Sequence, residues 1–325
     1  MKAVVCTQYG GPEMLEVKDI DSPPVGKGMV KIDVKAAGVN YPDALIIQGK
    51  YQFRPDPPFT PGGEVAGVIS EVGEGVTNVK VGDRVLSLLM AHGGFAEQAV
   101  TPAAMAVPIP DTMPFDEAAG FLMTYGTTYH ALKQRGKLQP GETLGVLGAA
   151  GGTGITAVEL GKLMGAKVIA CASSDEKLAL TKDYGADLVI NYAKEDLKTA
   201  LKEATGGKGV DVIYDPVGGD YCEPAFRAMA WKGRFLVIGF VAGIPKLPTN
   251  LALLKGADLV GVFWGGFTQK EPELNVQNTV ELLELYDQGK IKPHISEHFP
   301  LDKAPEAIAH LAARKAKGKV VVTMA

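Results

Sequence analysis

The 325-residue sequence is poor in cysteine and has no long apolar run. Cys6, Cys171 and Cys222 are odd in number and widely scattered, which gives no disulfide framework and favours a reduced, cytoplasmic setting. No apolar run reaches the roughly 18 residues that a membrane-spanning helix needs, so no span is predicted. The start of the chain, Met1–Thr7, lacks the apolar segment of a signal peptide and is predicted to form a strand.

An excess of charge of one sign is also missing. The chain has 33 Lys and Arg residues against 37 Asp and Glu residues, a net charge of −4. This balance gives no reason to expect nucleic acid or an anionic membrane surface as a partner. An apolar content of 46% and a charged content of 22% are ordinary for a globular protein, and the length predicts about two domains.

A glycine-rich turn is the most informative stretch of the chain. A short apolar strand, Leu144–Leu147, runs into Gly148–Gly154; a helical pattern then extends to Gly165, and a second strand follows. Glycines at the strand-to-helix turn of a βαβ unit predict a dinucleotide whose pyrophosphate lies at the helix N-terminus. One register is Ala149-x-Gly151-x-x-Gly154, and a second, from Gly152 to Ala157, also fits. The predicted cofactor contacts here are Ala150, Gly151, Gly152, Thr153 and Gly154.

The residues after the second strand favour NADP(H) over NAD(H). Ser173 stands nineteen residues beyond Gly154, where an NAD site usually has an acid. Ser173 and Ser174 can donate hydrogen bonds to a 2′-phosphate, and Lys177 can neutralise it. Ser174 to Lys177 is alternatively a capped helix start, and both interpretations can hold. Asp175 and Glu176 count against a phosphate because they would repel it.

The remaining patterns divide the chain into two domains. Up to about residue 120, short apolar runs between Gly, Pro and Asn-rich turns predict an antiparallel sheet or partial barrel; the runs are Met29–Ala37, Glu64–Val72 and Arg84–Met90. Strands and helices then alternate, which predicts an α/β, doubly wound parallel sheet. Its candidate strands are Leu144–Leu147, Lys167–Cys171, Leu188–Ile190, Val210–Tyr214, Arg234–Ile238 and Leu259–Phe263.

Two helix-like stretches, Val276–Gln288 and Ala304–Ala313, precede a last strand, Lys319–Thr323, that is predicted to return to the first domain. The predicted division is therefore residues 1–122 and 268–325 for one domain and residues 123–267 for the domain inserted in it. We expect the active site in the cleft between these domains, a usual place for ligand sites.

Seven motifs in a fixed order carry a resemblance that covers essentially the whole chain. They are Gly38–Asp43, Pro61–Gly67, Val81–Val85, Gly126–Tyr129, Gly148–Gly154, Asp211–Gly218 and Gly318–Val321. Their order and spacing resemble the medium-chain dehydrogenase/reductase superfamily, specifically its zinc-free quinone oxidoreductase (zeta-crystallin-like) branch. The resemblance implies a doubly wound parallel Rossmann sheet inserted in a GroES-like, mostly antiparallel β partial-barrel domain. It also implies NADPH as hydride donor and a homodimer that pairs the last sheet strands, here Leu259–Phe263.

Departures from the pattern of the zinc alcohol dehydrogenases predict that no metal is bound. Asn40 stands where those enzymes have a cysteine ligand, Gly63 replaces the histidine of Gly-His-Glu, and the four-cysteine lobe is missing. Zinc needs about three protein ligands in a catalytic site and four in a structural one. His294 and His298 have i,i+4 spacing, but Pro293 and Pro300 predict extended or turn structure there. His130 is predicted on a helix, and the loop residue His92 can border the cleft.

Without a metal to polarise a simple carbonyl, alcohol oxidation is not expected. Quinones and the activated C=C bonds of enals, enones, haloacrylates or acryloyl thioesters accept hydride without such help. The protein then needs mainly to stack the acceptor on the nicotinamide and to donate hydrogen bonds to the developing oxyanion. By their place in the family motifs, Asn40, Tyr51 and Thr127 are the candidates for this side of the site, with Tyr51 as a possible donor of a hydrogen bond or proton. Their structural alternatives are a turn residue, a packing residue and a helix cap.

The other cofactor candidates follow the later strands of the parallel sheet. Tyr192 is predicted to cover the adenine, and Val217, in the turn Asp215–Gly219, to lie at the nicotinamide half. Phe240, Phe263 and Trp264 are predicted to line the nicotinamide pocket, with core packing as the alternative. Lys319 is predicted to reach a phosphate, with an exposed lysine as the alternative.

Three functions follow, from two classes. The first is quinone reduction by NADPH, and the second is reduction of a conjugated C=C bond by the same cofactor. The third is a nucleotide-binding protein without turnover, for example a redox sensor, for which no residue gives positive support. For the two reductases the partner is a small-molecule quinone or enone-type substrate.

Overall fold

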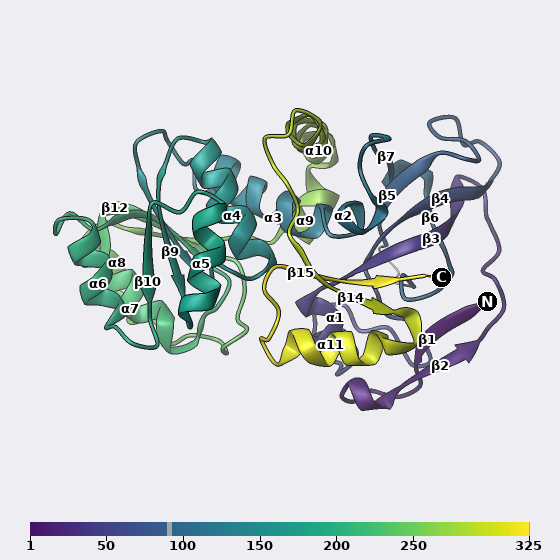
Figure 1. Cartoon of the computed structure of the whole chain (residues 1–325), viewed down its shortest axis with the longest axis horizontal. Helices are drawn as coiled ribbons and strands as arrows, with labels where there is room; N and C mark the ends of the chain where they lie inside the picture. The colour runs from purple at the N-terminus through teal and green to yellow at the C-terminus, as the bar shows by residue number, and fades with distance from the viewer. Residues whose placement is uncertain (90–92, 325) are drawn as a thin grey trace. The chain divides into compact units, whose positions relative to one another are not determined.

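The computed structural model describes residues 1–89 and 93–324, which form two compact units (Figure 1). Unit 1 consists of Met1–Met123 and Pro293–Ala325, and unit 2 consists of Thr124–Lys292. The chain thus leaves unit 1 one residue from the first predicted boundary. It re-enters unit 1 at Pro293 instead of the predicted residue 268, and this second boundary was therefore wrong.

Unit 1 is organised around a mostly antiparallel sheet of seven strands in the order β14-β15-β3-β4-β5-β7, with β6 also paired to β3. The strands are β3 (Met29–Val39), β4 (Glu64–Val72), β5 (Arg84–Leu88), β6 (Gln98–Pro102), β7 (Ala106–Pro108), β14 (Ile295–Pro300) and β15 (Lys319–Thr323). β1 (Lys2–Cys6) and β2 (Leu15–Asp19) form a separate pair, and the helices are α1 (Tyr41–Ile46), α2 (Phe115–Ala119) and α11 (Ala304–Ala312). The antiparallel sheet predicted for the first 120 residues is confirmed.

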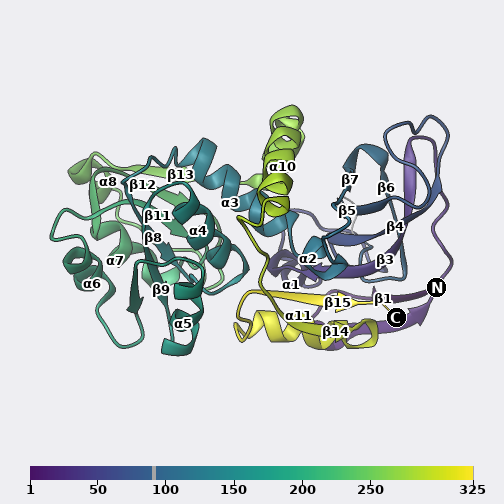
Figure 2. The ribbon, with the colours of Figure 1, turned by 45° about the horizontal axis from the view of Figure 1, so that its top comes forward.

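The C-terminal strand β15 completes this sheet. It pairs antiparallel with β3, in a register that places Val320 opposite Val39 and Thr323 opposite Ala36. In Figure 2 the yellow β15 runs beside the purple β3, although nearly 300 residues separate them in the chain. Val320, Val321 and Val322 are fully buried, which is why this apolar strand returns to unit 1 as predicted.

Unit 2 is a parallel sheet in the order β10-β9-β8-β11-β12-β13. The strands are β8 (Thr143–Leu147), β9 (Lys167–Ala172), β10 (Leu188–Asn191), β11 (Val210–Asp215), β12 (Met229–Val237) and β13 (Asp258–Gly261). Helices α4 (Gly152–Leu163) and α5 (Asp175–Asp183) cover one face, and α6 (Leu197–Ala204), α7 (Cys222–Arg227) and α8 (Asn250–Lys255) cover the other (Figure 1). This confirms the predicted doubly wound sheet. Its strand order reverses between β8 and β11, where ligands bind at the carboxyl ends of the strands in such folds.

The second boundary was wrong because α9 (Trp264–Lys270) and α10 (Pro272–Asp287) pack on unit 2. The Tyr129 hydroxyl donates to Glu281 on α10 at 2.6 Å, and Gln134 Nε2 donates to Asn278 Oδ1 at 2.9 Å. Both partners come from the segment Leu122–Arg135, which is π-helical on either side of the short α3 (Thr127–Tyr129). A helix-like pattern alone did not indicate which sheet the helix joins.

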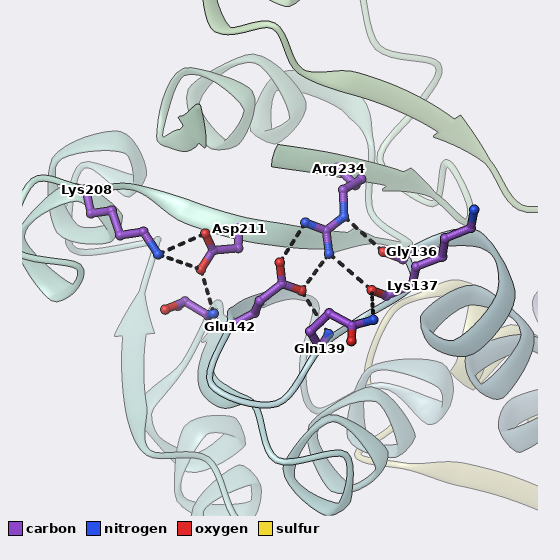
Figure 3. A network of polar contacts seen from close by, with 8 residues as sticks. Gly136, Lys137, Gln139, Glu142, Lys208, Asp211 and Arg234 are labelled. Atoms are coloured by element: carbon purple, nitrogen blue, oxygen red, sulfur yellow. Dashed lines mark hydrogen bonds and ion pairs between the residues drawn. The ribbon is translucent and has the colours of Figure 1, made fainter. Parts of the chain in front are cut away.

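A polar network fastens the amino ends of the central strands of unit 2 (Figure 3). The Arg234 guanidinium, on β12, donates two hydrogen bonds to Glu142, of 2.9 and 2.6 Å, directly before β8. Asp211, on β11, accepts the backbone N–H of Thr143 at 2.8 Å and pairs with Lys208. A bidentate pair between arginine and a carboxylate is geometrically specific, so this network fixes the relative register of β8, β11 and β12.

Among the described residues, we find no helix with both the length and the apolar character needed to cross a membrane.

Candidate functional site

The glycine-rich turn closes β8 onto α4 in unit 2. A Cβ atom on Gly154 would lie 2.2 Å from the carbonyl oxygen of Gly148, so only glycine allows this approach of helix and strand. The close approach at Gly154 favours the register that starts at Ala149 over the one that ends at Ala157. The left-handed residue of the turn is Gly148, with φ +58°, one position before Ala149.

The N-terminus of α4 has the form of an anion site. Gly151 precedes the helix in an extended conformation, and no side chain caps the helix there. At the ideal Cβ position of Gly151 the nearest atom is 3.4 Å away, so packing within the chain leaves room beside this residue. An uncapped N-terminus of a twelve-residue helix, reached over glycine backbone, fits a pyrophosphate.

The serines after β9 have different roles. Ser173 is exposed, whereas Ser174 caps α5 by accepting the backbone N–H of Lys177 at 3.3 Å. In the helix cap Ser174 Oγ acts as a hydrogen-bond acceptor. The hydroxyl proton of Ser174 is not used in the cap and can still be donated to a phosphate.

Asp175 does not stand as an uncompensated acid beside these serines. Its carboxylate accepts hydrogen bonds from Asn191 Nδ2 at 2.6 Å and Lys194 Nζ at 2.5 Å. The hydrogen bond from Lys194 is the largest of the effects that lower the pKa of Asp175 below its usual value. Lys194, which the sequence analysis did not name, thus offsets the repulsion that Asp175 was expected to cause.

The turns after β8, β11 and β12 lie against one another. Asp215 Oδ1 accepts the backbone N–H groups of Val217 and Gly218, at 2.8 and 2.9 Å, and burial raises the pKa of Asp215 to about 6. Val217 Cγ2 is 2.8 Å from the ideal Cβ position of Gly148, and the Val217 carbonyl accepts the N–H of Ala242 at 2.8 Å. The structure therefore brings Val217 to the glycine-rich turn, and its contact with the nicotinamide stays a prediction.

The aromatic residues predicted to contact the cofactor have three different environments. Tyr192 follows β10 and lies 4.5 Å from the ring of Tyr221. Phe240 and Phe263 are exposed, at the ends of β12 and β13. Trp264 is buried against Gly126, whose Cβ position lies 2.5 Å from the indole, so we correct its assignment from pocket lining to core packing.

Thr128, and not the predicted Thr127, carries the buried hydroxyl network of α3. Thr127 is half-buried and its carbonyl accepts the backbone N–H of His130, whereas the Thr128 hydroxyl lies 2.9 Å from the Tyr214 hydroxyl and 2.8 Å from Thr156 Oγ1. It also donates to the carbonyl of Thr153 at 3.3 Å. This buried network ties α3 to the first turns of α4 and to β11.

A buried ion pair lies at the centre of unit 1. Lys319 Nζ on β15 is 2.9 Å from Glu64 Oε2 on β4, and the two side chains are 5% and 0% exposed. The other oxygen of Glu64 accepts the backbone N–H of Met123 at 2.8 Å. Lys319 is thus neither exposed nor directed to a phosphate, and both predictions for this residue were wrong.

Asn40 joins the two charged partners. Its Oδ1 accepts from Lys319 Nζ at 2.6 Å, while its Nδ2 donates to Glu64 Oε2 at 3.1 Å and to the Gly38 carbonyl at 3.3 Å. Both amide protons are used, so Asn40 has no N–H left for a substrate in this arrangement. We correct its assignment from a direct substrate contact to a buried connector. The approach needs glycine at position 38, since a Cβ there would lie 2.2 Å from the Ala119 carbonyl.

Asp43 and Tyr51 extend this cluster. Asp43 Oδ2 accepts the backbone N–H of Asn40 at 2.8 Å, completing the capping box that starts α1. Burial raises the pKa of Asp43 to about 7. Burial, and after it the charge of Asp43, raise the pKa of the half-buried Tyr51 phenol. The charge of Asp43 therefore acts on the Tyr51 phenol. Asp43 belongs to the motif Gly38–Asp43 but was not predicted as a site residue.

The residues of this cluster do not fit a zinc ion. Asn40 is hydrogen-bonded throughout, Gly63 offers no side chain, and the Lys319 ammonium already lies 2.6 Å from Asn40 Oδ1. Over residues 1–89 and 93–324, no group of three or more His, Cys, Asp or Glu side chains could hold a metal. His298, on the extended strand β14, pairs with Asp116 of α2. His130 stacks on Phe267, and His92 lies outside the described residues.

Replacement of Lys319 by Met tests the energetic weight of the ion pair. Lys319→Met keeps most of the aliphatic side chain but leaves Glu64 buried without its cation. We expect unit 1 to lose about 3–5 kcal/mol of its free energy of unfolding, measured by urea denaturation. The control, Lys303→Met, breaks the exposed Lys303–Glu306 pair and should leave the midpoint nearly unchanged. A Lys319→Met protein as stable as the wild type would contradict this account.

Two family models match the chain. The one described as alcohol dehydrogenase GroES-like domain covers residues 26–111, and the one described as zinc-binding dehydrogenase covers residues 152–281. A curated relative, quinone oxidoreductase-like protein 2 homolog of Nematostella vectensis, is 40% identical over 99% of this chain and 88% of its own length.

Solved structures agree with these matches. The quinone oxidoreductase of Escherichia coli, crystallised with NADPH, superposes with a TM-score of 0.92 at 29% identity and covers 99% of this chain and all of its own. The CurK enoyl reductase gives a TM-score of 0.91 at 30% identity, over 100% of this chain and 99% of its own. The paired sheets, the glycine-rich turn and these similarities lead to one conclusion: the chain belongs to the medium-chain dehydrogenase/reductase superfamily, among the quinone oxidoreductases and their relatives.

Proposed function

We propose that this protein is a zinc-independent, NADPH-dependent quinone reductase. The observation that carries the proposal is the Lys319–Glu64–Asn40 cluster, in which Asn40, at the position of a cysteine ligand in the zinc enzymes, is hydrogen-bonded to the buried Lys319 ammonium and to Glu64. When bound, NADPH supplies a hydride, and an acceptor that is already polarised by conjugation needs no Lewis acid to take it. The relatives named quinone oxidoreductase support the quinone as acceptor.

Different residues of the chain bind different parts of the cofactor. The backbone of Ala150–Gly154 and the open N-terminus of α4 bind the pyrophosphate. Ser173, Ser174 and Lys177 bind the 2′-phosphate, beside an Asp175 that Lys194 already compensates. Tyr192 covers the adenine, and Val217, Phe240 and Phe263 contact the nicotinamide half. The Tyr51 phenol donates to the acceptor oxygen, and Thr127 lies on the nicotinamide side, held by its neighbour Thr128.

A second candidate, reduction of a conjugated C=C bond, is favoured by the similarity to an enoyl reductase. Enals, enones, haloacrylates and acryloyl thioesters share with quinones the delocalised anion that follows hydride addition, so the same residues serve both. The third candidate, a nucleotide-binding protein without turnover, keeps the cofactor contacts but requires no acceptor.

A screen of acceptors distinguishes these functions. Purified protein is mixed with NADPH and menadione, crotonaldehyde or acryloyl-CoA, and kcat/KM is measured from the loss of NADPH absorbance. We expect the highest kcat/KM with the quinone. Higher values for the alkenes would replace the first proposal by the second, and NADPH binding without oxidation would favour the third. Stoichiometric zinc in the active protein would refute zinc independence.

Preference for NADPH is tested at Lys177. Lys177→Ala removes the cation that faces the 2′-phosphate, so NADPH binding should weaken by about 1–2 kcal/mol, the scale of one charge-assisted hydrogen bond. NADH binding should be nearly unaffected, and both are measured by calorimetric titration. Lys182→Ala, at the other end of α5, serves as the control and should change neither. Equal affinity of the wild type for NADH and NADPH would contradict this assignment.

We propose that the protein forms a homodimer through β13. This strand is the last of the parallel sheet of unit 2, and large apolar side chains around it are exposed, among them Leu253 at 79% and Leu259 at 55%. An unpaired edge with apolar neighbours is a template for a second strand, and two copies of β13 can pair about a twofold axis. The three cysteines, all buried and free, suit a cytoplasmic setting.

The dimer is tested by charging the edge. Leu259→Lys places a lysine on each copy of β13 at the pairing face, so sedimentation velocity should detect monomer in place of dimer. Ile244→Lys, on a loop of unit 2 where the side chain is 83% exposed, is the matched control and should leave the dimer intact. A monomeric wild type, or a dimer that tolerates Leu259→Lys, would refute pairing through this strand.

A further inference from the structure

The carboxyl ends of three neighbouring strands of unit 2 are joined by backbone hydrogen bonds. The N–H of Ala149, in the glycine-rich turn after β8, donates to the Cys171 carbonyl of β9 at 3.0 Å. The N–H of Tyr192, directly after β10, donates to the carbonyl of Ala172, the last residue of β9, at 3.1 Å. These bonds hold the ends of β8, β9 and β10 in a row. At this edge of such a fold, an acid selects NAD by accepting a hydrogen bond from the ribose 2′-OH.

Asp175 is an acid of this region. It stands 21 residues beyond Gly154, close to the spacing of about 20 residues at which NAD sites have their acid. It lies in the first turn of α5, and its side chain is 69% exposed. Ser173 and Lys177, which we propose bind the 2′-phosphate, are each two residues away. A free carboxylate here would repel the 2′-phosphate of NADPH and offer an acceptor to the 2′-OH of NADH.

The carboxylate of Asp175 is not free, because the turn after β10 donates to both of its oxygens. Asn191 Nδ2 donates to Asp175 Oδ1 at 2.6 Å, and Lys194 Nζ donates to Asp175 Oδ2 at 2.5 Å. Asn191 is itself held in place, since it is buried and its Oδ1 accepts the N–H of Ala193 at 3.1 Å. Its carbonyl accepts the N–H groups of Lys194 and Glu195, at 2.9 and 3.0 Å, so the backbone that carries Lys194 is fixed as well.

The two donors keep Asp175 ionised and compensate its charge. The hydrogen bonds from Lys194 and from Asn191 lower the pKa of Asp175, so the carboxylate carries its full charge at neutral pH. The Lys194 ammonium balances that charge. Both charged side chains are exposed, so their pairing adds little to the stability of the protein and is screened by salt. Its effect is therefore on the charge that a ligand meets at the ends of β9 and β10.

Resting on the proposed preference for NADPH, we propose that Lys194 is a specificity-determining residue that acts through Asp175. With Lys194 in place, the acid of an NAD site is present but occupied, and the serines and Lys177 decide the choice of coenzyme. Without Lys194, Asp175 Oδ2 is a free acceptor for the ribose hydroxyls and an uncompensated charge beside the phosphate. The loss of one exposed lysine should therefore weaken the binding of NADPH and strengthen the binding of NADH.

The test is the dissociation constants of NADPH and NADH, measured by calorimetric titration of the purified protein at low salt. Lys194→Met keeps most of the aliphatic side chain and removes the charge. NADPH should bind about 5-fold more weakly, the scale of one exposed ion pair, and NADH should bind more tightly. Lys208→Met removes the exposed lysine of the Lys208–Asp211 pair at the amino end of β11, and this matched control should change neither constant. In about 1 M NaCl, where the screening length is about 3 Å, the loss for NADPH should shrink.

A double-mutant cycle separates this role from direct contact of Lys194 with the phosphate. If Lys194 acts through Asp175, Lys194→Met in the Asp175→Asn background should change each constant by less than about 2-fold. A loss of NADPH affinity of the same size in both backgrounds would mean that Lys194 binds the phosphate itself, and the inference would be wrong. Unchanged constants for both coenzymes in Lys194→Met alone would also overturn it.

The proposed preference for NADPH and the role of Lys194 fail separately. The ratio of the two constants in the wild type tests the preference, whereas the change of this ratio in Lys194→Met tests the role of Lys194. The same change should be seen with 2′,5′-ADP and 5′-AMP, which lack the nicotinamide half, because Asp175 acts at the 2′ position. A change with the whole coenzymes but not with these two nucleotides would refute the inference.

Discussion

The ion pair between Lys319 and Glu64 is the constraint on which unit 1 depends. It connects β15 to β4, and through Asn40 and the Met123 N–H it also connects the end of β3 and the segment that leads out of the unit. Four stretches that are far apart in sequence thus meet at two charged groups. Such a pair contributes little when compared with apolar residues of equal size, but the loss of one partner is severe because the other charge stays buried. The cluster therefore specifies one arrangement of the sheet more than it adds stability.

The same arrangement shows how side chains distant in sequence are held together in unit 1. At the centre of unit 1 an ammonium and an amide hold the strands together through their hydrogen bonds to each other and to Glu64. In unit 2 the close approach of backbone at Gly154, the buried contact between the Thr128 and Tyr214 hydroxyls and the Asp215 carboxylate, which accepts backbone N–H groups, shape the carboxyl end of the sheet. Polar side chains in both units therefore hold shape, and the reactive groups are few.

Much of the fold could be predicted because local patterns decide it. The alternation of apolar strands with helical stretches predicted the parallel sheet, and the apolar run of β15 predicted the return of the chain. The site was harder, since Trp264, Lys319 and Asn40 were judged by motif position, and their roles depend on contacts with residues distant in sequence. One signal was available: Glu64 and Lys319 each stand as a charged residue at the start of an apolar strand, and buried charges of opposite sign require each other. The second domain boundary, after α10, had no such signal, because helical periodicity does not indicate which of the two sheets a helix packs on.

The position of Lys319 in the chain has a consequence for biosynthesis. Unit 2, Thr124–Lys292, leaves the ribosome complete and can fold while the last segment is still being made. Glu64 is synthesised far earlier and waits for its counterion until Lys319 emerges. During that interval the first 123 residues lack both β15 and the cation that pairs with Glu64, so the sheet of unit 1 can be completed only after the whole of unit 2 has been synthesised.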